Sequence, residues 1–458
     1  MTRSTKRTLS QLLSAARIST GELEDTAHLS TQHRSAYETD GDKISFTEAF
    51  RTLADKTQVH GRVDTGGDLR NRLTHSIEVS RVGRSLGVAL GARMIGYYGL
   101  YAPPSAEAFW QINPNDIGSI VAAACLGHDL GNPPFGHDGE DAISAYFRDT
   151  VDGQRAVEAA GPQVGAELCL HEGNAQGFRM ITRSMGWREE GGLNLTAATL
   201  AAFGKYPFPL KPGAKKYGVH RADMGTMEFV ANATAMVRDG EGWRRHPLAW
   251  MMEAADDICY LTVDLEDAAW LGMISFDDLC DLYAPIVGDD EIMHGRRMNN
   301  QPRAIQYFRS RMVKTLISSS VEIYPDIAAQ LDDATLPKGA YGGGIVGHSR
   351  HAEQMEVIRR FSSKEIYSSK ITQTERGGFR QAMMDAMQAL VSEMLQWLKA
   401  AGPQIKANDK DYPALAKLPQ ARLGTMIPRE ADKAFPWLLD QITLMSDAQT
   451  FDLGHLKK

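Results

Sequence analysis

The sequence contains little cysteine, and this limits the kinds of protein that it can encode. Four cysteines occur among 458 residues, and no two of them form a C-x-x-C pair. Disulfide frameworks and thiolate zinc sites both depend on paired cysteines, so neither is expected. Reduced thiols and a cytoplasmic location are predicted instead. The four residues are Cys125, Cys169, Cys259 and Cys280.

Long apolar runs are missing as well. The longest one, Ile117–Leu126, is well short of the roughly 20 apolar residues that a membrane-spanning helix needs. The first residues, MTRSTKRTLSQLLSAAR, are basic, but their apolar stretch is too short and interrupted for a signal peptide. We therefore expect no membrane partner.

A strong excess of positive charge is also absent. The formal net charge is −7, so the chain is no general binder of polyanions, and any nucleic-acid contact needs a local basic patch. Hydrophobic residues make up 43% and charged residues 23% of the chain. This balance is typical of a globular protein with a sizeable core.

Helical periodicity dominates from Phe46 onward. Apolar residues recur there at spacings of three and four, which is typical of amphipathic helices. Alternating strand patterns are few, and the candidates at 340–346 and 215–219 are glycine-rich, which suits a hairpin or an ordered loop. The predicted fold is mostly α, with a few short strands or hairpins. Helices are expected over residues 73–90, 117–126, 195–203, 227–237, 248–271, 305–323, 379–398 and 437–445.

The chain is expected to fall into three segments. Residues 1–45 are polar and lack steady periodicity, which suggests an N-terminal arm. Residues 46–290 are expected to form the core. Residues 291–458 are predicted to be a helical C-terminal portion that packs on this core rather than hanging from a linker.

The densest chemical signal is the string CLGHDLGNPPFGHDGE at residues 125–140. His128 and Asp129 end an apolar run there, so an imidazole and a carboxylate are placed at a buried helix terminus. Both are good ligands for a divalent metal. Adjacent residues of a helix point about 100° apart, so other elements must close the site.

Two further predicted helices supply polar residues on one face. Arg72 and His75 are three residues apart and share a face. Asp256, Tyr260 and Asp264 fall at every fourth position of an otherwise apolar helix, where polar groups are costly unless a ligand satisfies them. Singly, each is more often an ordinary core or surface residue, but their occurrence together predicts a site for a divalent metal, Mg, Mn or similar. Its predicted ligands are His75, His128, Asp129 and Asp256.

The order H…HD…D resembles that of the HD-domain phosphohydrolase superfamily. Longer strings resemble the bacterial dGTP triphosphohydrolases and occur in order over roughly residues 45–270. The resemblance implies an HD-type helical catalytic core over residues 46–290. The strings are KTQV at 56–59, RLTHS at 72–76, HDLGNPPFGHDGE at 128–140, HEGNAQ at 171–176, KYP at 205–207 and EAADDICY…DLED at 253–267.

The resemblance implies metal-dependent hydrolysis of dGTP or another dNTP to deoxynucleoside and inorganic triphosphate. Water attacks the α-phosphorus and the 5′ oxygen of the sugar leaves. Because a sugar alkoxide is a poor leaving group, it needs a proton donor, and imidazole titrates near neutral pH. The resemblance assigns this task to His137, with Glu140 to orient it, and places His171 near the α-phosphate.

The resemblance also implies the substrate contacts. Tyr260 and Asp264 are expected to select deoxyribose, the carboxylate by accepting from the 3′ hydroxyl and the ring by excluding a 2′ hydroxyl. Gln58 and Val59 are expected to read the base, since an amide offers a purine edge both donors and acceptors. The expected phosphate contacts are Arg72, Asn174, Lys205 and Lys216, with Arg311 as a further candidate.

One stretch departs from the family pattern and leaves the preferred base open. His60 stands where the family more often has an aromatic or apolar residue, and residues 60–71 are rich in glycine. This stretch adjoins the expected base pocket. Residues 362–378 are also expected to approach the active site, with Tyr367 and Glu375 as candidate contacts.

The resemblance further implies a homo-oligomer, with a hexamer favoured, and regulation by single-stranded DNA or a nucleotide. Two alternatives stay open. One is an HD phosphohydrolase acting on a nucleoside monophosphate or a cyclic nucleotide, against which the strings at 56–59 and 171–176 argue. The other is a non-catalytic nucleotide or nucleic-acid sensor, against which the presence of His137, Glu140 and every predicted metal ligand argues.

Overall fold

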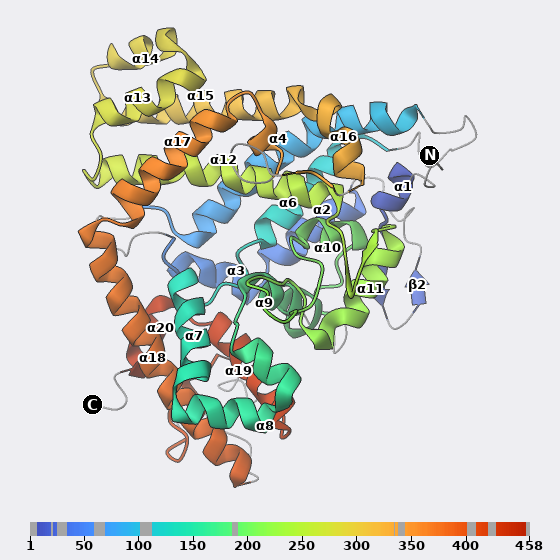
Figure 1. Cartoon of the computed structure of the whole chain (residues 1–458), viewed down its shortest axis with the longest axis vertical. Coiled ribbons are helices and arrows are strands. Elements are labelled where there is room, and N and C mark those ends of the chain that lie inside the picture. The colour runs from blue at the N-terminus through green and yellow to red at the C-terminus, as the bar shows by residue number, and fades with distance from the viewer. Residues whose placement is uncertain are drawn as a thin grey trace.

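The computed structural model confirms that the fold is mostly α (Figure 1). It describes residues 7–19, 22–24, 34–58, 69–100, 112–185, 191–333, 335–337, 344–400, 409–419 and 427–454. The α-helices are α1 (Leu9–Leu12), α2 (Ala36–Ser45), α3 (Glu48–Thr52), α4 (Arg72–Gly99), α6 (Pro114–Gly127), α7 (His137–Asp149), α8 (Val151–Leu168), α9 (Gly173–Arg179), α10 (Ala197–Phe203), α11 (Met224–Ala233), α12 (Pro247–Trp270), α13 (Phe276–Val287), α14 (Asp289–Arg296), α15 (Gln301–Glu322), α16 (Tyr324–Asp332), α17 (Ala352–Ser362), α18 (Lys370–Lys399), α19 (Ala431–Thr443) and α20 (Asp447–Gly454). Shorter helical turns are η1 (Leu53–Asp55), η2 (Met180–Ser184), η3 (Arg221–Asp223), η4 (Val346–His348), η5 (Ser363–Tyr367) and η6 (Leu415–Lys417).

Among the described residues, the strands lie outside the two ranges that the sequence suggested. β1 (Arg17–Ser19) pairs antiparallel with β2 (Glu22–Glu24), and β3 (Arg238–Asp239) pairs with β4 (Gly242–Trp243). Residues 215–219 form an ordered loop instead, where the Gly218 amide donates to the Phe208 carbonyl at 3.2 Å. In the described end of the other range, residues 344–345 form a turn and Val346 begins η4.

The helices α4 and α6 pack closely because glycines line their contact. A Cβ atom on Gly87 of α4 would lie 2.8 Å from the Cα atom of Gly118 on α6. Larger residues there would force the two helices apart. Helix α12 crosses this pair, as Figure 1 shows, so one end of α4, one end of α6 and the middle of α12 converge.

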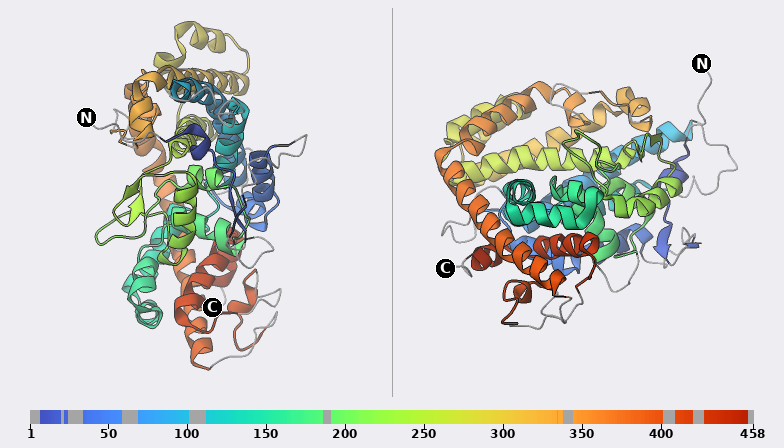
Figure 2. Two further views of the ribbon diagram at one scale, coloured as in Figure 1. Left: turned by 90° about the vertical axis from the view of Figure 1, so that its right-hand side faces the viewer. Right: turned by 60° about the horizontal axis from the view of Figure 1, so that its bottom comes forward.

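A second hydrophobic core lies beside the first. It is formed by α7 and α8 together with α18, α19 and α20, which gather in the lower half of Figure 1 and stay together in both views of Figure 2. Fully buried Phe147 and Phe435 belong to it. Since α6 belongs to the first core and α7 to the second, the loop 128–136 between them joins the two.

The N-terminal range holds more regular structure than the expected arm. Its described part contains α1, the β1–β2 hairpin and α2. Ser35 caps α2 by accepting from the Glu38 amide, and α2 packs on α6. The boundaries near residues 45 and 290 stay proposals. Among the described residues, no helix is long and apolar enough to cross a membrane.

Candidate metal centre and substrate cavity

Three helices bring the predicted metal ligands toward one point. His75 lies in the first turns of α4, which Asn71 caps by accepting from the Thr74 amide at 2.9 Å. His128 follows directly after the last residue of α6. Asp256 comes from the middle of α12. The apolar faces of the three helices form the core, so the polar residues meet where that core ends.

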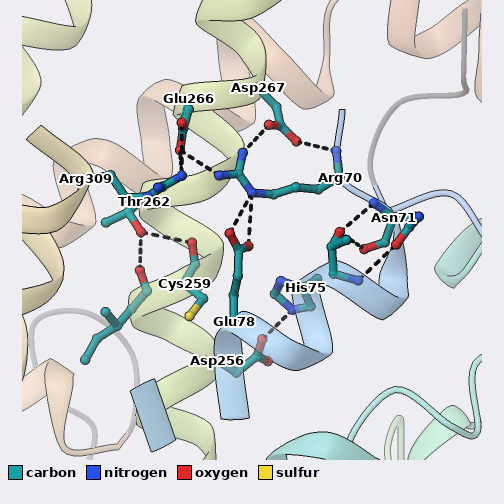
Figure 3. A network of polar contacts seen from close by, with 12 residues as sticks. Arg70, Asn71, His75, Glu78, Asp256, Cys259, Thr262, Glu266, Asp267 and Arg309 are labelled. Atoms are coloured by element: carbon teal, nitrogen blue, oxygen red, sulfur yellow. Dashed lines mark hydrogen bonds and ion pairs between the residues drawn. The ribbon is translucent and has the colours of Figure 1, made fainter. Parts of the chain in front are cut away.

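His75, His128 and Asp256 form a compact group. Each offers one ligand atom, and these atoms all lie within 4.8 Å of one another. The Nε2 atom of His75 is 3.1 Å from Oδ1 of Asp256, a contact drawn in Figure 3, and Nε2 of His128 is 3.6 Å from the same oxygen. Two imidazoles and a carboxylate at this separation are a donor set that divalent metals accept.

The second ring nitrogen of His128 supports this interpretation. Its Nδ1 atom lies 2.6 Å from the Cys125 carbonyl oxygen, so it carries the proton and donates. That bond fixes the tautomer and leaves the lone pair of Nε2 toward Asp256. Histidines that bind metals are commonly oriented by such a bond from the other nitrogen. The residues present therefore fit a divalent cation.

Asp129 lies beside this group rather than in it. Its Oδ2 accepts from Arg72 at 2.9 Å, and its Oδ1 accepts from the amide of Asn132 at 2.5 Å. Oδ1 is also 3.7 Å from Nε2 of His128. Burial raises the pKa of the Asp129 carboxyl, but the positive charges of Arg72, His128 and His75 together outweigh burial, and the pKa is lowered overall. Asp129 is therefore ionised next to the three grouped ligands.

An ionic network holds α4 against α12 next to the metal group (Figure 3). Arg70 donates to Glu78 of α4 at 3.0 Å and to Glu266 and Asp267 of α12 at 2.7 and 2.5 Å. Arg309 of α15 also reaches Glu266, at 2.8 Å. Buried ion pairs specify geometry more reliably than they add stability. This network joins the helices that carry His75 and Asp256.

His137 enters the site through an unusual turn. Phe135 and Gly136 have φ angles of 64° and 56°, in the left-handed region. A Cβ atom on Gly136 would lie 2.0 Å from the Arg72 guanidinium, so the glycine also permits a close approach. His137 then begins α7, with its side chain exposed to the cavity. Its partial burial and the charges of Arg72 and Lys216 lower its pKa.

Glu140 follows His137 by three residues on α7 and binds the backbone of a neighbouring segment. Its Oε1 accepts from the Gly173 amide at 3.0 Å, and no described contact joins it to His137. Burial and then the neighbouring Glu172 raise the pKa of Glu140 to about 7. Glu172 itself accepts from Asn174 at 2.6 Å and pairs with Lys216 at 2.8 Å.

A cavity of about 400 Å³ opens over the metal group, within the size range of small-molecule sites. Gln58 lines it, and its Oε1 atom is buried without a hydrogen-bond partner among the described residues. A buried unpaired acceptor is costly unless a ligand satisfies it. Val59, the other expected base contact, lies outside the described residues. The expected site residues that line the cavity are Gln58, Arg72, His75, His128, Asp129, His137, Asp256 and Tyr260.

Two stacked tyrosines also line the cavity. The rings of Tyr260 and Tyr367 are 5.8 Å apart and tilted by 13°. The Tyr367 hydroxyl donates to Oδ2 of Asp264 at 2.5 Å. Burial raises the pKa of Asp264 to about 7. Residues 362–378 therefore do approach the site, through Tyr367 and the cavity-lining Thr372 and Arg376.

Several expected contacts lie behind the cavity or away from it. His171 is buried, and both its ring nitrogens lack partners among the described residues; burial lowers its pKa to about 3. Lys205 pairs with Glu253 at 3.1 Å. Arg311 pairs with Glu291 on α14 instead of lining the cavity.

Sequence reasoning missed two polar residues of this region. Arg376 lines the cavity and donates to both oxygens of Asp138 at 2.9 Å. Glu172 is 2% exposed and binds two of the expected phosphate contacts. Its place directly after His171 in the string HEGNAQ was the available signal, whereas nothing local indicates that Arg376 reaches α7.

Curated proteins of similar sequence share most of this chain, although no family model matches it. A deoxyguanosinetriphosphate triphosphohydrolase-like protein of Pseudomonas aeruginosa is 35% identical over 353 residues, 75% of each chain. One from Synechocystis is 35% identical over 376 residues, 78% of this chain and 80% of its own. A deoxyguanosinetriphosphate triphosphohydrolase of Klebsiella pneumoniae is 28% identical over 415 residues, 79% of this chain and 78% of its own. The chain therefore belongs to the deoxyguanosinetriphosphate triphosphohydrolase family.

Proposed function

We propose that this chain hydrolyses dGTP, and other dNTPs less readily, to the deoxynucleoside and inorganic triphosphate. One observation carries the proposal. A single cavity of about 400 Å³ is lined by the grouped His75, His128 and Asp256, by the imidazole of His137 and by the stacked Tyr260. A metal group, a proton donor and a sugar-sized apolar wall are the parts that this reaction needs.

The metal-binding part of the proposal rests on four side chains. His75, His128 and Asp256 would hold a divalent ion, with the ionised Asp129 as the fourth ligand. When bound, such an ion supplies charge stabilisation at the α-phosphate and makes water more acidic. Mg and Mn are both candidates.

Residues of this chain supply the proton for the leaving group and the positive charge that binds the phosphates. Water attacks the α-phosphorus and releases a proton to solvent, from which His137 is protonated again; the bond from phosphorus to the 5′ oxygen breaks, and its electron pair stays on that oxygen. His137 gives its proton to the 5′ oxygen, so that an alcohol leaves rather than an alkoxide. Arg72 lines the same cavity, and we assign its guanidinium to a phosphate oxygen.

We further propose that Glu140 orients His137 and that His171 lies near the α-phosphate, while Asn174, Lys205 and Lys216 contact the triphosphate. Lys216 is 45% exposed and reaches Glu172, so a triphosphate can exchange places with that carboxylate. Glu140 holds the backbone of Gly173 directly before Asn174. A homo-oligomer, with a hexamer favoured, and regulation by single-stranded DNA or a nucleotide remain part of the proposal, and light scattering with and without these ligands tests both.

A product assay tests the proposed reaction. Each dNTP is incubated with the protein and Mn or Mg, and the products are resolved by ion-pair chromatography. Deoxynucleoside and triphosphate, formed fastest from dGTP, are expected. Monophosphate with pyrophosphate would overturn the proposal. No turnover of any dNTP would favour a non-catalytic sensor, and turnover only of nucleoside monophosphates or cyclic nucleotides would favour another HD phosphohydrolase.

Replacing Tyr260 with Ala is expected to weaken discrimination against ribonucleotides. The ring stacks on Tyr367 and forms the wall beside Asp264, so its removal makes room for a 2′ hydroxyl. We expect the kcat/KM ratio of dGTP to GTP to fall about tenfold, which corresponds to about 1.4 kcal/mol. Phe46→Ala, which removes an aromatic ring that is 81% exposed, is the control. An unchanged ratio of kcat/KM for dGTP and GTP in Tyr260→Ala would show that the ring does not select the sugar.

The raised pKa of Asp264 predicts how dNTP binding depends on pH. Below its pKa of about 7 the carboxyl is protonated, and above it the group is ionised and can only accept hydrogen bonds. Because the sugar 3′ hydroxyl needs an acceptor, KM should fall as the pH rises from about 6 to about 8. The variant Asp264→Asn lacks this carboxyl, so any change of its KM with pH comes from titration of the substrate or of other groups. An equal fall in that variant would show that Asp264 does not contribute.

A further inference from the structure

The C-terminal helix α20 reaches two parts of the site through one carboxylate. Oδ2 of Asp447 accepts from the Thr57 amide at 2.8 Å, and Oδ1 accepts from the Phe135 amide at 3.0 Å. Thr57 directly precedes Gln58, and Phe135 lies two residues before His137. The same side chain therefore fixes the backbone next to the proposed base contact and next to the proposed proton donor.

Asp447 is not needed to cap its own helix. Ser446 does that, because its hydroxyl accepts from the Gln449 amide at 3.1 Å while the Gln449 side chain accepts from the Ser446 amide at 2.9 Å. This reciprocal pair is a complete capping box. The two carboxylate oxygens of Asp447 instead accept hydrogen bonds from backbone amides 390 and 312 residues away along the chain.

Lys56 links the segment before Gln58, the loop 128–136 and the end of α19 through two further hydrogen bonds. Its side chain is buried, and Nζ donates to the Asn132 carbonyl at 2.8 Å and to the Thr443 carbonyl at 2.5 Å. An ammonium group is seldom buried without a specific set of acceptors. Lys56 and Asp447 together bind residues 56–57, the loop 132–135 and the junction of α19 with α20.

The loop needs such support because its backbone is strained. Phe135 has a φ angle of 64°, which a residue with a Cβ atom adopts only when its surroundings enforce it. Its ring stacks on Phe379 of α18, with centroids 4.7 Å apart, and meets the edge of Phe451 of α20 at 5.3 Å. Helix α20 therefore holds both the amide and the ring of the strained residue.

We propose that α20 is a positioning element of the active site, in which Asp447 and Phe451 hold the turn that presents His137. The inference rests on the proposed role of His137 as proton donor. Neither residue lines the cavity, so both act through the loop. A displacement of about 1 Å in a catalytic group can cost about 100-fold in rate. Loss of the contacts of Asp447 or Phe451 with this turn is therefore expected to lower turnover and to leave the metal ligands in place.

The test compares Asp447→Asn with Asp452→Asn, an exposed aspartate of the same helix. An amide presents one oxygen and one NH2 group, so Asp447→Asn can keep one of the two backbone bonds but not both. Turnover of dGTP, metal content and hydrogen exchange of peptides covering residues 57 and 133–137 are measured. Each substitution is also made in a His137→Gln background. Phe451→Leu is a second variant, which weakens the contact of α20 with the Phe135 ring.

In Asp447→Asn we expect kcat to fall about 10- to 100-fold, with metal content unchanged and faster exchange at 133–137. The same substitution should lower kcat less than about twofold when His137 is already Gln, because effects that act through one group are not additive. Phe451→Leu should show the same pattern at smaller size, and Asp452→Asn no change. An equal loss in both backgrounds, or unchanged kcat, would overturn the inference. If the unaltered protein turns over no dNTP, the proposed function fails independently of this inference. Unchanged hydrogen exchange at residues 133–137 in Asp447→Asn would still show that Asp447 does not hold this turn.

Discussion

Replacing Asp256 with Asn is expected to abolish metal retention and to lower dNTP turnover by about 1,000-fold or more. Asp256 is the residue that both grouped histidines face, at 3.1 Å from His75 and 3.6 Å from His128. The substitution keeps the size of the side chain but removes the charge that offsets a cation. Elemental analysis after dialysis measures the metal, and the product assay measures the turnover.

The matched control for this prediction is Asp290→Asn, which removes an exposed carboxylate from α14. It should retain metal and activity. Addition of Mn at millimolar concentration separates weakened binding from lost chemistry, since a partial recovery of turnover is expected only in the first case. Full metal retention by Asp256→Asn would remove Asp256 from the ligand set.

Replacing His137 with Gln is expected to leave metal content unchanged but to lower kcat by about 100- to 10,000-fold, the usual contribution of a general acid. His137 begins α7 and lines the cavity, but it is not one of the grouped residues. Glutamine keeps a polar side chain of similar reach and lacks a proton that it can transfer near neutral pH.

The exposed His294 on α14 offers the control substitution His294→Gln, which should not change turnover. Substrate binding should also persist in His137→Gln, so KM for dGTP should change much less than kcat. A loss below about tenfold, or a loss that follows the metal content, would contradict the role of His137 as proton donor.

The parts of the site that the sequence predicted are those set by local pattern. Helices α4, α6 and α12 follow from the spacing of apolar residues, and His75, His128 and Asp256 stand at helix positions that this spacing defines. Polar residues inside an apolar stripe need a partner. Their convergence could therefore be expected before the packing of the helices was known.

Contacts that join distant segments were not predictable in this way. The bond from Tyr367 to Asp264 spans 103 residues, and the bond from Thr57 to Asp447 spans 390. No periodicity or motif encodes which backbone amide a distant carboxylate will accept from. The bond from the Gly173 amide to the Glu140 carboxylate is a further example, because it joins residues 33 positions apart.

Attack of water at the α-phosphorus is tested most directly by the fate of the oxygen atom that comes from water. The reaction is run with dGTP and Mn in water enriched in oxygen-18, and the products are weighed by mass spectrometry. Attack at the α-phosphorus with departure of the 5′ oxygen predicts one heavy oxygen in the inorganic triphosphate and none in deoxyguanosine. A heavy oxygen in a monophosphate or in pyrophosphate, or in the deoxynucleoside itself, would contradict the account.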